Sequence, residues 1–167
     1  ELVCGAFSSN PEVSVQSGKE LGLNSSRCYT SFTELFEKEQ LLPDNERMQV
    51  VSIVTPNHMH FEPAKIAMQS GCHVILDKPM AFSLAEAKIL KSIAEETGQR
   101  FCLTHTYTGY PMVKEAKQQI AEGKLGIIKK IYVEYPQGWL SKLEENKGNK
   151  QAVWRADPSK SGKGGAL

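Results

Sequence analysis

The chain has 167 residues, a length that suits one domain or one and a half. Hydrophobic residues make up 40% of it and charged residues 23%, so the composition excludes a disordered tail and a fibrous protein. Its 20 basic and 19 acidic side chains leave a formal charge of +1, which gives no field that would gather nucleic acid or an anionic membrane.

The N-terminal part predicts one strand and two helices. Residues Leu2–Phe7 form an apolar run typical of a strand, and a polar group, Ser8–Asn10, follows it. A helix is expected from Pro11, because proline is favoured in a first helical turn. A second helix is expected after Ser31, since Ser31 and Glu34 have the spacing of a capping box.

The central part predicts three further strands separated by helices. Val50–Val54 is apolar on both faces apart from one serine, which is typical of a parallel strand covered on both sides. Strands and helices alternating at this spacing predict βαβ units and a parallel sheet. The later elements are a helix at His58–Ser70, a strand at His73–Leu76, a helix opened by the capping box of Ser83 and Glu86, and a strand at Phe101–Thr104.

A polar group follows each predicted strand directly. The groups are Ser8–Ser9, Thr55–Asn57, Asp77–Pro79 and His105. Each group by itself is an ordinary turn, a helix cap, a solvated lysine or a hydrogen-bonded histidine. In an open parallel sheet, however, ligands bind beyond the carboxyl ends of the strands, so the four groups together indicate one site.

Two of these groups have side chains suited to chemistry. Thr55-Pro56-Asn57 precedes a helix, where backbone and amide groups can contact a phosphate, a ribose or a nicotinamide. Lys78 at a strand end can place its ammonium against a substrate hydroxyl, or can give and take a proton when part of the lysine is in its neutral form. Pro79 fixes the backbone beside Lys78, with a cis bond as one way of doing so.

The pattern changes after His105. Pro111–Ala121 predicts a helix, and Ile127–Tyr135 alternates apolar with polar residues, which predicts a strand with one solvated face. We therefore expect one domain over residues 1–105 and the beginning of another over residues 106–167.

Cysteine usage and hydropathy favour a soluble, cytoplasmic protein. The four cysteines, Cys4, Cys28, Cys72 and Cys102, form no Cys-x-x-Cys pair, and three lie in or beside apolar runs. We expect reduced, mostly buried thiols and no metal site. No apolar stretch approaches the ~20 residues that a membrane helix needs, and no export signal is recognisable.

In its combined motifs the sequence resembles the Gfo/Idh/MocA family of NAD(P)-dependent oxidoreductases. The family usually has Glu-Lys-Pro where this chain has Asp77-Lys78-Pro79. The resemblance implies an α/β fold with an incomplete Rossmann-type parallel sheet, then the start of an α+β domain for substrate binding and homo-oligomer formation. The matching segments are Val51–Asn57 with His60, Gly71–Pro79, Thr104–Gly126, Trp154–Arg155, Asp157–Pro158 and the closing glycines.

The resemblance also implies hydride transfer between NAD or NADP and a hydroxyl-bearing carbon of a sugar, cyclitol or related polyol. It assigns catalysis to Lys78, which Asp77 steadies, and we expect substrate contacts from His105 and Tyr107. Two alternatives stay open: a glycosidase of the same architecture that uses tightly held NAD, and a non-catalytic family member. The residues expected to bind the cofactor are Ser8, Ser9, Thr55, Pro56, Asn57, His60, Asp77, Lys78 and Pro79.

The sequence departs from the family pattern in three features. It has no Gly-x-Gly-x-x-Gly turn for the cofactor pyrophosphate, and it lacks the later Asp and His that often complete the catalytic group. We therefore expect an internal piece of a longer enzyme that by itself binds dinucleotide weakly or not at all and is inactive. The acidic residue that usually holds the adenosine ribose is replaced by Ser8 and Ser9. These serines suit the 2′-phosphate of NADP, with Arg27 or Lys19 near in sequence, and do not exclude NAD.

Overall fold

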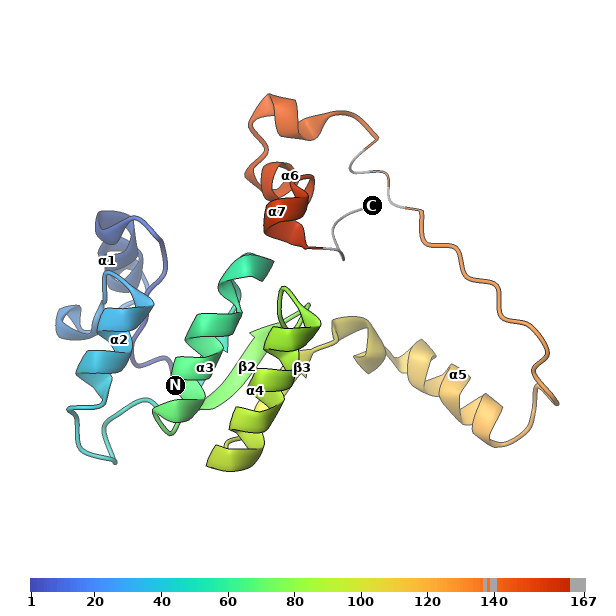
Figure 1. The fold of residues 1–167 in the computed structure, drawn as a ribbon, viewed down its shortest axis with the longest axis horizontal. Helices are drawn as coiled ribbons and strands as arrows, with labels where there is room; N and C mark the ends of the chain where they lie inside the picture. Colours follow the sequence, from blue (N-terminus) through green and yellow to red (C-terminus); the bar gives the residue numbers. More distant parts are fainter. Residues whose placement is uncertain (137, 139–140, 163–167) are drawn as a thin grey trace. The chain divides into compact units, whose positions relative to one another are not determined.

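The computed structural model of the protein describes residues 1–136, 138 and 141–162 (Figure 1). The chain divides into two compact units, Glu1–Leu103 and Thr104–Leu167. Among the described residues, no helix is both long enough and apolar enough to cross a lipid bilayer. Each unit is described by itself.

The first unit is built on a three-stranded sheet in the order β1-β2-β3. Its strands are β1 (Val50–Ile53), β2 (His73–Asp77) and β3 (Phe101–Thr104), the last ending at the unit boundary. Strands β1 and β2 are parallel, with Val50 opposite His73 and Ile53 opposite Leu76. Because the strands run in the same direction, the chain leaves both of them at the same edge of the sheet. The predicted α/β fold with a partial parallel sheet is confirmed.

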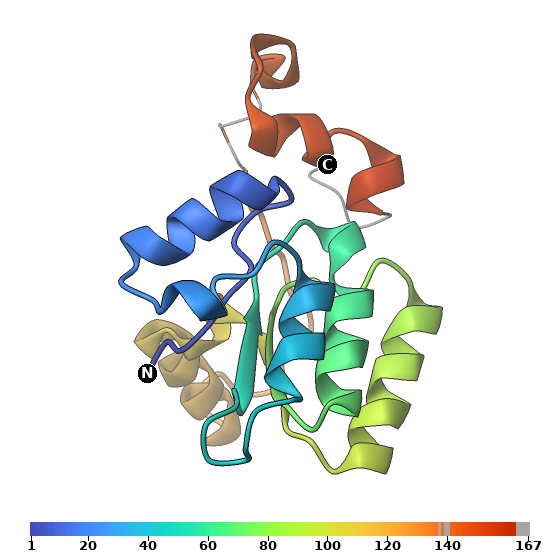
Figure 2. The same cartoon turned by 90° about the vertical axis from the view of Figure 1, so that its left-hand side faces the viewer.

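Three helices, α2 (Phe32–Glu39), α3 (Phe61–Gln69) and α4 (Leu84–Thr97), lie side by side against one face of the sheet. Figure 2 shows them as the blue, teal and light green helices. The core lies between this helical layer and the sheet, and α3 is its centre. The side chains of this core with no exposed surface are Ala64, Ala67, Met68, Leu76 and Leu90.

The opposite face of the sheet is more open than the sequence predicts. Val50 is 49% exposed and Ile75 is 39% exposed, and the side chain of Cys102 in β3 is also exposed. Successive side chains of a strand point to opposite faces, so these residues share the face away from α2, α3 and α4. The predictions that the apolar strand Val50–Val54 is covered on both sides and that Cys102 is buried are therefore wrong.

The segment Leu2–Phe7 does not form the predicted strand. Its only ladder contact among the described residues is a parallel bridge between Gly5 and Cys28. The amide of Gly5 donates to the carbonyl of Arg27 at 3.2 Å, and the amide of Tyr29 donates to the carbonyl of Gly5 at 2.9 Å. These two hydrogen bonds pair the backbone N–H and C=O of Gly5 alone. A strand requires an extended neighbouring segment that pairs with its backbone groups along its whole length.

The predicted helix signals of the first unit are largely confirmed. Helix α1 runs from Pro11 to Glu20. Ser31 caps α2, although the Glu34 carboxylate bonds the amide of Thr30 rather than that of the capping residue. Ser83 and Glu86 form the complete capping box of α4.

The secondary-structure elements of the second unit, among its described residues, are all helices. It contains η3 (Thr106–Gly109), α5 (Pro111–Ala121), η4 (Glu144–Lys147), α6 (Lys150–Arg155) and α7 (Pro158–Ser161). Helix α5 confirms its prediction, but Ile127–Tyr135 forms no strand, and Ile127, Ile131 and Val133 are 87%, 77% and 78% exposed. An alternating segment becomes a strand only when another strand pairs with it. Trp139 and the glycines at 164 and 165 lie outside the described residues.

Candidate functional site

Two loops leave the sheet at the same edge and carry most of the predicted site residues. Thr55–Asn57 follows β1, and Asp77–Pro79 lies at the end of β2. Between them in sequence lies α3, which crosses over the sheet and packs on both strands. The sequence pattern predicted this convergence, and the parallel register of β1 and β2 produces it.

His60 joins the two loops through its side chain. Its Nε2 atom lies 2.7 Å from the carbonyl oxygen of Thr55, and its Nδ1 atom lies 2.7 Å from the carbonyl oxygen of Pro79. The residue has no exposed surface. His60 was expected to bind the cofactor, whereas both of its ring nitrogens lie at hydrogen-bond distance from backbone carbonyl oxygens of the protein.

The first loop is folded tightly by its own backbone. The turn η2 (Asn57–Met59) begins there, with the amide of Met59 donating to the carbonyl of Pro56 at 2.8 Å. The hydroxyl of Thr55 is exposed and donates to the carbonyl of Met59 at 3.2 Å. Asn57 is only 7% exposed. The loop thus presents the hydroxyl of Thr55 at the surface and keeps Asn57 inside.

The second loop presents an exposed lysine beside a fixed carboxylate. Oδ1 of Asp77 accepts the backbone N–H of Lys78 at 2.9 Å. Asp77 is half-buried, whereas Lys78 is exposed, and the peptide bond between Lys78 and Pro79 is cis. Asp77 therefore bonds the backbone from which the Lys78 ammonium extends.

Ser8 and Ser9 lie just before α1, whose N-terminus is capped by Asn10. The hydroxyl oxygen of Ser8 accepts the N–H of Asn10 at 3.1 Å, and Ser9 is exposed. The sequence did not indicate that fully buried Ser14 supports this segment: its hydroxyl accepts the N–H of Phe7 at 2.8 Å and donates to the carbonyl of Tyr29 at 2.6 Å.

The guanidinium of Arg27 is paired with the carboxylate of Glu39. Arg27 Nε donates to Glu39 Oε1 at 2.9 Å, and the same oxygen accepts the hydroxyl of Tyr29 at 2.7 Å. The N–H of Met48 donates to Glu39 Oε2 at 3.0 Å. Glu39 is 1% exposed, and a buried carboxylate needs such partners. Glu39 engages Nε and Nη2 of Arg27, and the suggested contact of Arg27 with a 2′-phosphate stays a prediction.

This cluster sets the pKa values of its members. Burial by itself would raise the pKa of Glu39, but hydrogen bonds from Arg27, Tyr29 and Met48 outweigh it and hold that pKa below its ordinary value. Burial, reinforced by the Glu39 charge, raises the pKa of the Cys4 thiol to about 12. A spacing of twelve residues between Arg27 and Glu39 gives no sequence signal for such a pair.

His105 and Tyr107 lie in the second unit. His105 follows β3. Its carbonyl oxygen accepts two hydrogen bonds from Thr108, one from the backbone N–H at 2.9 Å and one from the side-chain hydroxyl at 2.7 Å. The ring of Tyr107 is 60% exposed and makes edge contacts with Tyr110 and Tyr135 at centroid distances of 5.6 and 6.3 Å. Their expected contact with substrate stays a prediction.

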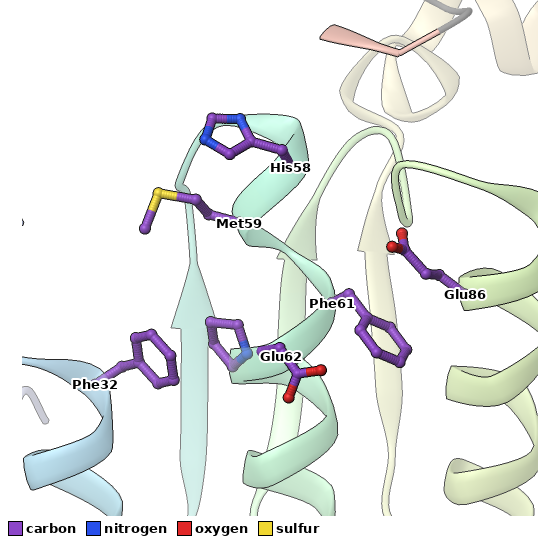
Figure 3. A pocket seen from close by; sticks show the side chains of 7 residues that line it. Phe32, His58, Met59, Phe61, Glu62 and Glu86 are labelled. Carbon is purple, nitrogen blue, oxygen red and sulfur yellow. The ribbon is translucent and has the colours of Figure 1, made fainter. Parts of the chain in front are cut away.

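A hollow of about 410 Å³ opens beside the start of α3, on the helical side of the first unit. Figure 3 shows Phe61 turned toward Glu86 of α4 and Phe32 reaching in from α2. The Glu86 carboxylate already accepts the N–H groups of Phe82 and Ser83. None of the predicted site residues lines this hollow, whose walls are Phe32, His58, Met59, Phe61, Glu62, Pro63 and Glu86.

The exposed groups of the first unit fit parts of a nicotinamide dinucleotide. Hydroxyls at Ser9 and Thr55 and the ammonium of Lys78 are exposed. Hydroxyl and ammonium groups suit the ribose hydroxyls, carboxamide and phosphates of such a molecule. The 167 residues contain no Gly-x-Gly-x-x-Gly motif that would bind the pyrophosphate of such a molecule. Among the described residues, no three His, Cys, Asp or Glu side chains gather as a metal site would require.

Comparisons with known proteins match nearly the whole length of this chain. The model of the family described as "Oxidoreductase family, NAD-binding Rossmann fold" (GFO_IDH_MocA) matches residues 2–105. An uncharacterized oxidoreductase, YfiI of Bacillus subtilis, is 33% identical over 97% of the chain. Levoglucosan dehydrogenase of Pseudarthrobacter phenanthrenivorans is 30% identical over 93% of it.

A solved structure agrees closely with the fold. It is that of an inositol dehydrogenase homologue from Azotobacter vinelandii complexed with NAD+, which superposes with a TM-score of 0.90 at 36% identity over 97% of this chain. The same homologue complexed with NADH and myo-inositol gives a TM-score of 0.83 at 35% identity over 95%. The chain spans only 36% to 41% of the length of these proteins.

Proposed function

The chain belongs to the Gfo/Idh/MocA oxidoreductase family, and on this basis we propose that the protein transfers hydride between NAD(P) and a hydroxyl-bearing carbon of a sugar, cyclitol or related polyol. The expected family resemblance is thereby confirmed. When bound, a nicotinamide nucleotide supplies or accepts the hydride, which no protein side chain can do. The chain's own residues bind the nucleotide, orient the substrate and move protons.

One observation carries the proposal. The imidazole of His60 touches the carbonyl of Thr55 and the carbonyl of Pro79, so the two polar loops meet at a common edge of the sheet. The edge beyond the carboxyl ends of parallel strands is where open α/β sheets bind their ligands. Had the loops lain on opposite sides of the first unit, a shared cofactor and substrate site would have been ruled out.

Lys78 is the residue proposed to act on the substrate. Its exposed side chain hydrogen-bonds the reacting hydroxyl: as a neutral amine it accepts the hydroxyl proton when the carbon loses hydride, and as an ammonium it returns that proton in the reverse direction. Asp77 holds the backbone of Lys78 through the 2.9 Å bond to its N–H, so the lysine stem starts from a fixed point. The exposed Thr55 side chain and backbone groups of Pro56 and Asn57 on the neighbouring loop are proposed to hold the cofactor, with Ser8 and Ser9 on its adenosine side.

The relatives support the substrate class. One is named levoglucosan dehydrogenase, and the inositol dehydrogenase homologue was crystallised with NADH and myo-inositol. Both compounds are ring polyols whose oxidation removes hydride from a carbon that bears a hydroxyl. We propose the same class of substrate for this protein.

One assay tests the cofactor and the substrate together. The protein that contains this chain is incubated with NAD+ or NADP+ and with myo-inositol, levoglucosan or glucose, and reduced nicotinamide is followed by its ultraviolet absorbance. Polyol-dependent reduction with one of the two cofactors is the expected result. Absence of reduction with every polyol would contradict the proposal, and hydrolysis of chromogenic glycosides by protein that retains NAD would favour the glycosidase alternative.

A further inference from the structure

The hydroxyl of Ser14 lies where the backbone pairing of the N-terminal segment stops. Gly5 is paired as in a parallel ladder: its N–H donates to the carbonyl of Arg27, and its carbonyl accepts the N–H of Tyr29. Two residues further along, a parallel ladder would join the N–H of Phe7 to the carbonyl of Tyr29. The Ser14 hydroxyl stands between these two groups instead, because it accepts the N–H of Phe7 at 2.8 Å and donates to the carbonyl of Tyr29 at 2.6 Å.

The direction of both hydrogen bonds follows from the groups involved. A backbone N–H can only donate and a carbonyl oxygen can only accept, so the single hydrogen of the hydroxyl points to Tyr29 and a lone pair faces Phe7. The side chain of Ser14 has no exposed surface. Removal of the hydroxyl would therefore take a partner from two backbone groups at once.

Ser14 also bonds the far end of the loop that carries Ser8 and Ser9. Its backbone N–H donates to the carbonyl of Asn10 at 2.9 Å, in the first turn of α1. Inside the loop, the hydroxyl of Ser8 accepts the N–H of Asn10 at 3.1 Å, and Ser9 is exposed. One residue thus holds the chain immediately before Ser8 and immediately after Ser9.

Close packing of α1 keeps Ser14 in this place. A Cβ atom at Gly18 would lie 2.6 Å from Sγ of Cys28 and 3.4 Å from the ring of Phe7, so the helix approaches Cys28 more closely than a larger residue would allow. Ser14 and Gly18 are the buried residues of α1, and their spacing of four puts them on one face of the helix. The seat of the whole helix therefore holds the hydroxyl against Phe7 and Tyr29.

We propose that Ser14 is a positioning residue that fixes the Ser8–Asn10 loop for contact with the adenosine ribose of the bound dinucleotide. The inference rests on the proposed function, in which Ser8 and Ser9 lie on the adenosine side of the cofactor. Ser14 touches no cofactor, because its side chain has no exposed surface. It acts by ending the backbone pairing after Gly5 and holding both ends of the loop that presents Ser9.

Amide hydrogen exchange tests the loop without any ligand. In the unaltered protein we expect the amide of Phe7 to exchange at least about tenfold more slowly than that of Ser9, because a buried hydroxyl binds it. Ser14→Ala should reduce this protection about tenfold and leave the rate of the core amide of Val74 unchanged. Ser17→Ala removes a hydroxyl from the same helix and is the matched control, expected to leave Phe7 protected. An unprotected Phe7 amide in the unaltered protein, or equal acceleration at Phe7 and Val74 in Ser14→Ala, would overturn the proposal.

Binding of the adenosine half by itself tests the link to the cofactor. The protein that contains this chain is titrated calorimetrically with ADP-ribose and with its 2′-phosphate, which carry the adenosine side and no nicotinamide. For the probe that the unaltered protein binds more tightly, Ser14→Ala should raise Kd about tenfold and Ser17→Ala less than about twofold. An unchanged Kd in Ser14→Ala, or binding of neither probe by the unaltered protein, would overturn the role given to Ser14.

Turnover separates this role from the proposed function. In Ser14→Ala the KM for the dinucleotide should rise about tenfold, while kcat and the KM for polyol change less than about threefold, because the loop binds the end of the cofactor away from the reacting carbon. A fall in kcat with an unchanged KM for the dinucleotide would contradict the proposal. If the unaltered protein binds an adenosine probe but oxidises no polyol, the proposed function fails, while calorimetry and amide exchange still decide the role of Ser14.

Discussion

The guanidinium of Arg27 binds both oxygens of the Glu39 carboxylate, with Nε 2.9 Å from Oε1 and Nη2 2.5 Å from Oε2. The pair joins the turn before α2 to the last residue of that helix, and the side chain of Glu39 is only 2% exposed. It therefore fixes the segment that bridges to Gly5 against the core. Removal of this pair should lower the stability of the fold rather than the rate of the catalysed reaction.

Glu39→Gln is expected to lower the free energy of unfolding by about 2–4 kcal/mol, because it leaves the Arg27 guanidinium without its counter-charge. Urea denaturation measures the change. Asp44→Asn is the matched control, since Asp44 pairs with Arg47 at 3.2 Å but its side chain is 89% exposed. Loss of that surface pair should cost less than about 0.5 kcal/mol. Equal losses of unfolding free energy in the two variants would contradict the inference that the buried pair stabilises the fold more than the exposed pair.

The stabilisation from Glu39 should disappear in acid. The pKa of Glu39 is lowered in the folded protein, because the bonds from Arg27, Tyr29 and Met48 outweigh the effect of burial. A lowered folded pKa gives stability that is present above the unfolded value of about 4.3 and is lost as pH falls through the folded value. Urea titrations from neutral pH toward about pH 3 should show the difference between wild type and Glu39→Gln shrinking. A difference in unfolding free energy that stays constant over this pH range would refute a lowered pKa of Glu39 in the folded protein.

Lys78→Ala is expected to lower kcat/KM for polyol oxidation by about a hundredfold or more, the range that a positioned proton-transfer group contributes. Lys88→Ala changes an exposed lysine on α4 and should leave turnover unaltered. Steady-state rates per folded molecule make the comparison. Unchanged oxidation of every accepted polyol in Lys78→Ala would remove the role given to this lysine.

Thiol alkylation should report the open face of the sheet. Cys102 is exposed, whereas burial raises the pKa of Cys4 to about 12 and also raises the pKa of Cys72. The thiolate is the reacting form, so iodoacetamide should modify Cys102 at least about tenfold faster than Cys4 or Cys72. Peptide mass spectrometry follows each site, and urea should abolish the difference. Comparable rates in the native protein would contradict it.

The sequence predicted the three strands of the sheet and the starts of several helices. The runs at Val50, His73 and Phe101 became strands, and the capping residues Ser31 and Ser83 started helices where expected. Leu2–Phe7 and Ile127–Tyr135 have equally good strand patterns but form no strand. Alternation and β-branching describe what a strand can bury, and only the tertiary fold decides whether a neighbour supplies its hydrogen bonds.

The same limit applies to the site. The sequence indicated that Thr55–Asn57 and Asp77–Pro79 end adjacent strands, and that was sufficient to place them at one edge. It did not show whether the nitrogens of His60 face a ligand or the protein, because Pro79 is nineteen residues away. The partner of Arg27 was equally hidden, since a guanidinium twelve residues from a glutamate has no periodic relation to it.

The contacts that join the two loops have an implication for folding order. His60 lies five residues from Thr55 and nineteen from Pro79, and only α3 and the neighbouring strands intervene. Contacts between residues so near in sequence require the closure of short loops, which makes them early rather than late events in folding. The edge that presents Lys78 can therefore mature with its own strand–helix–strand unit, before more distant parts of the polypeptide have been synthesised.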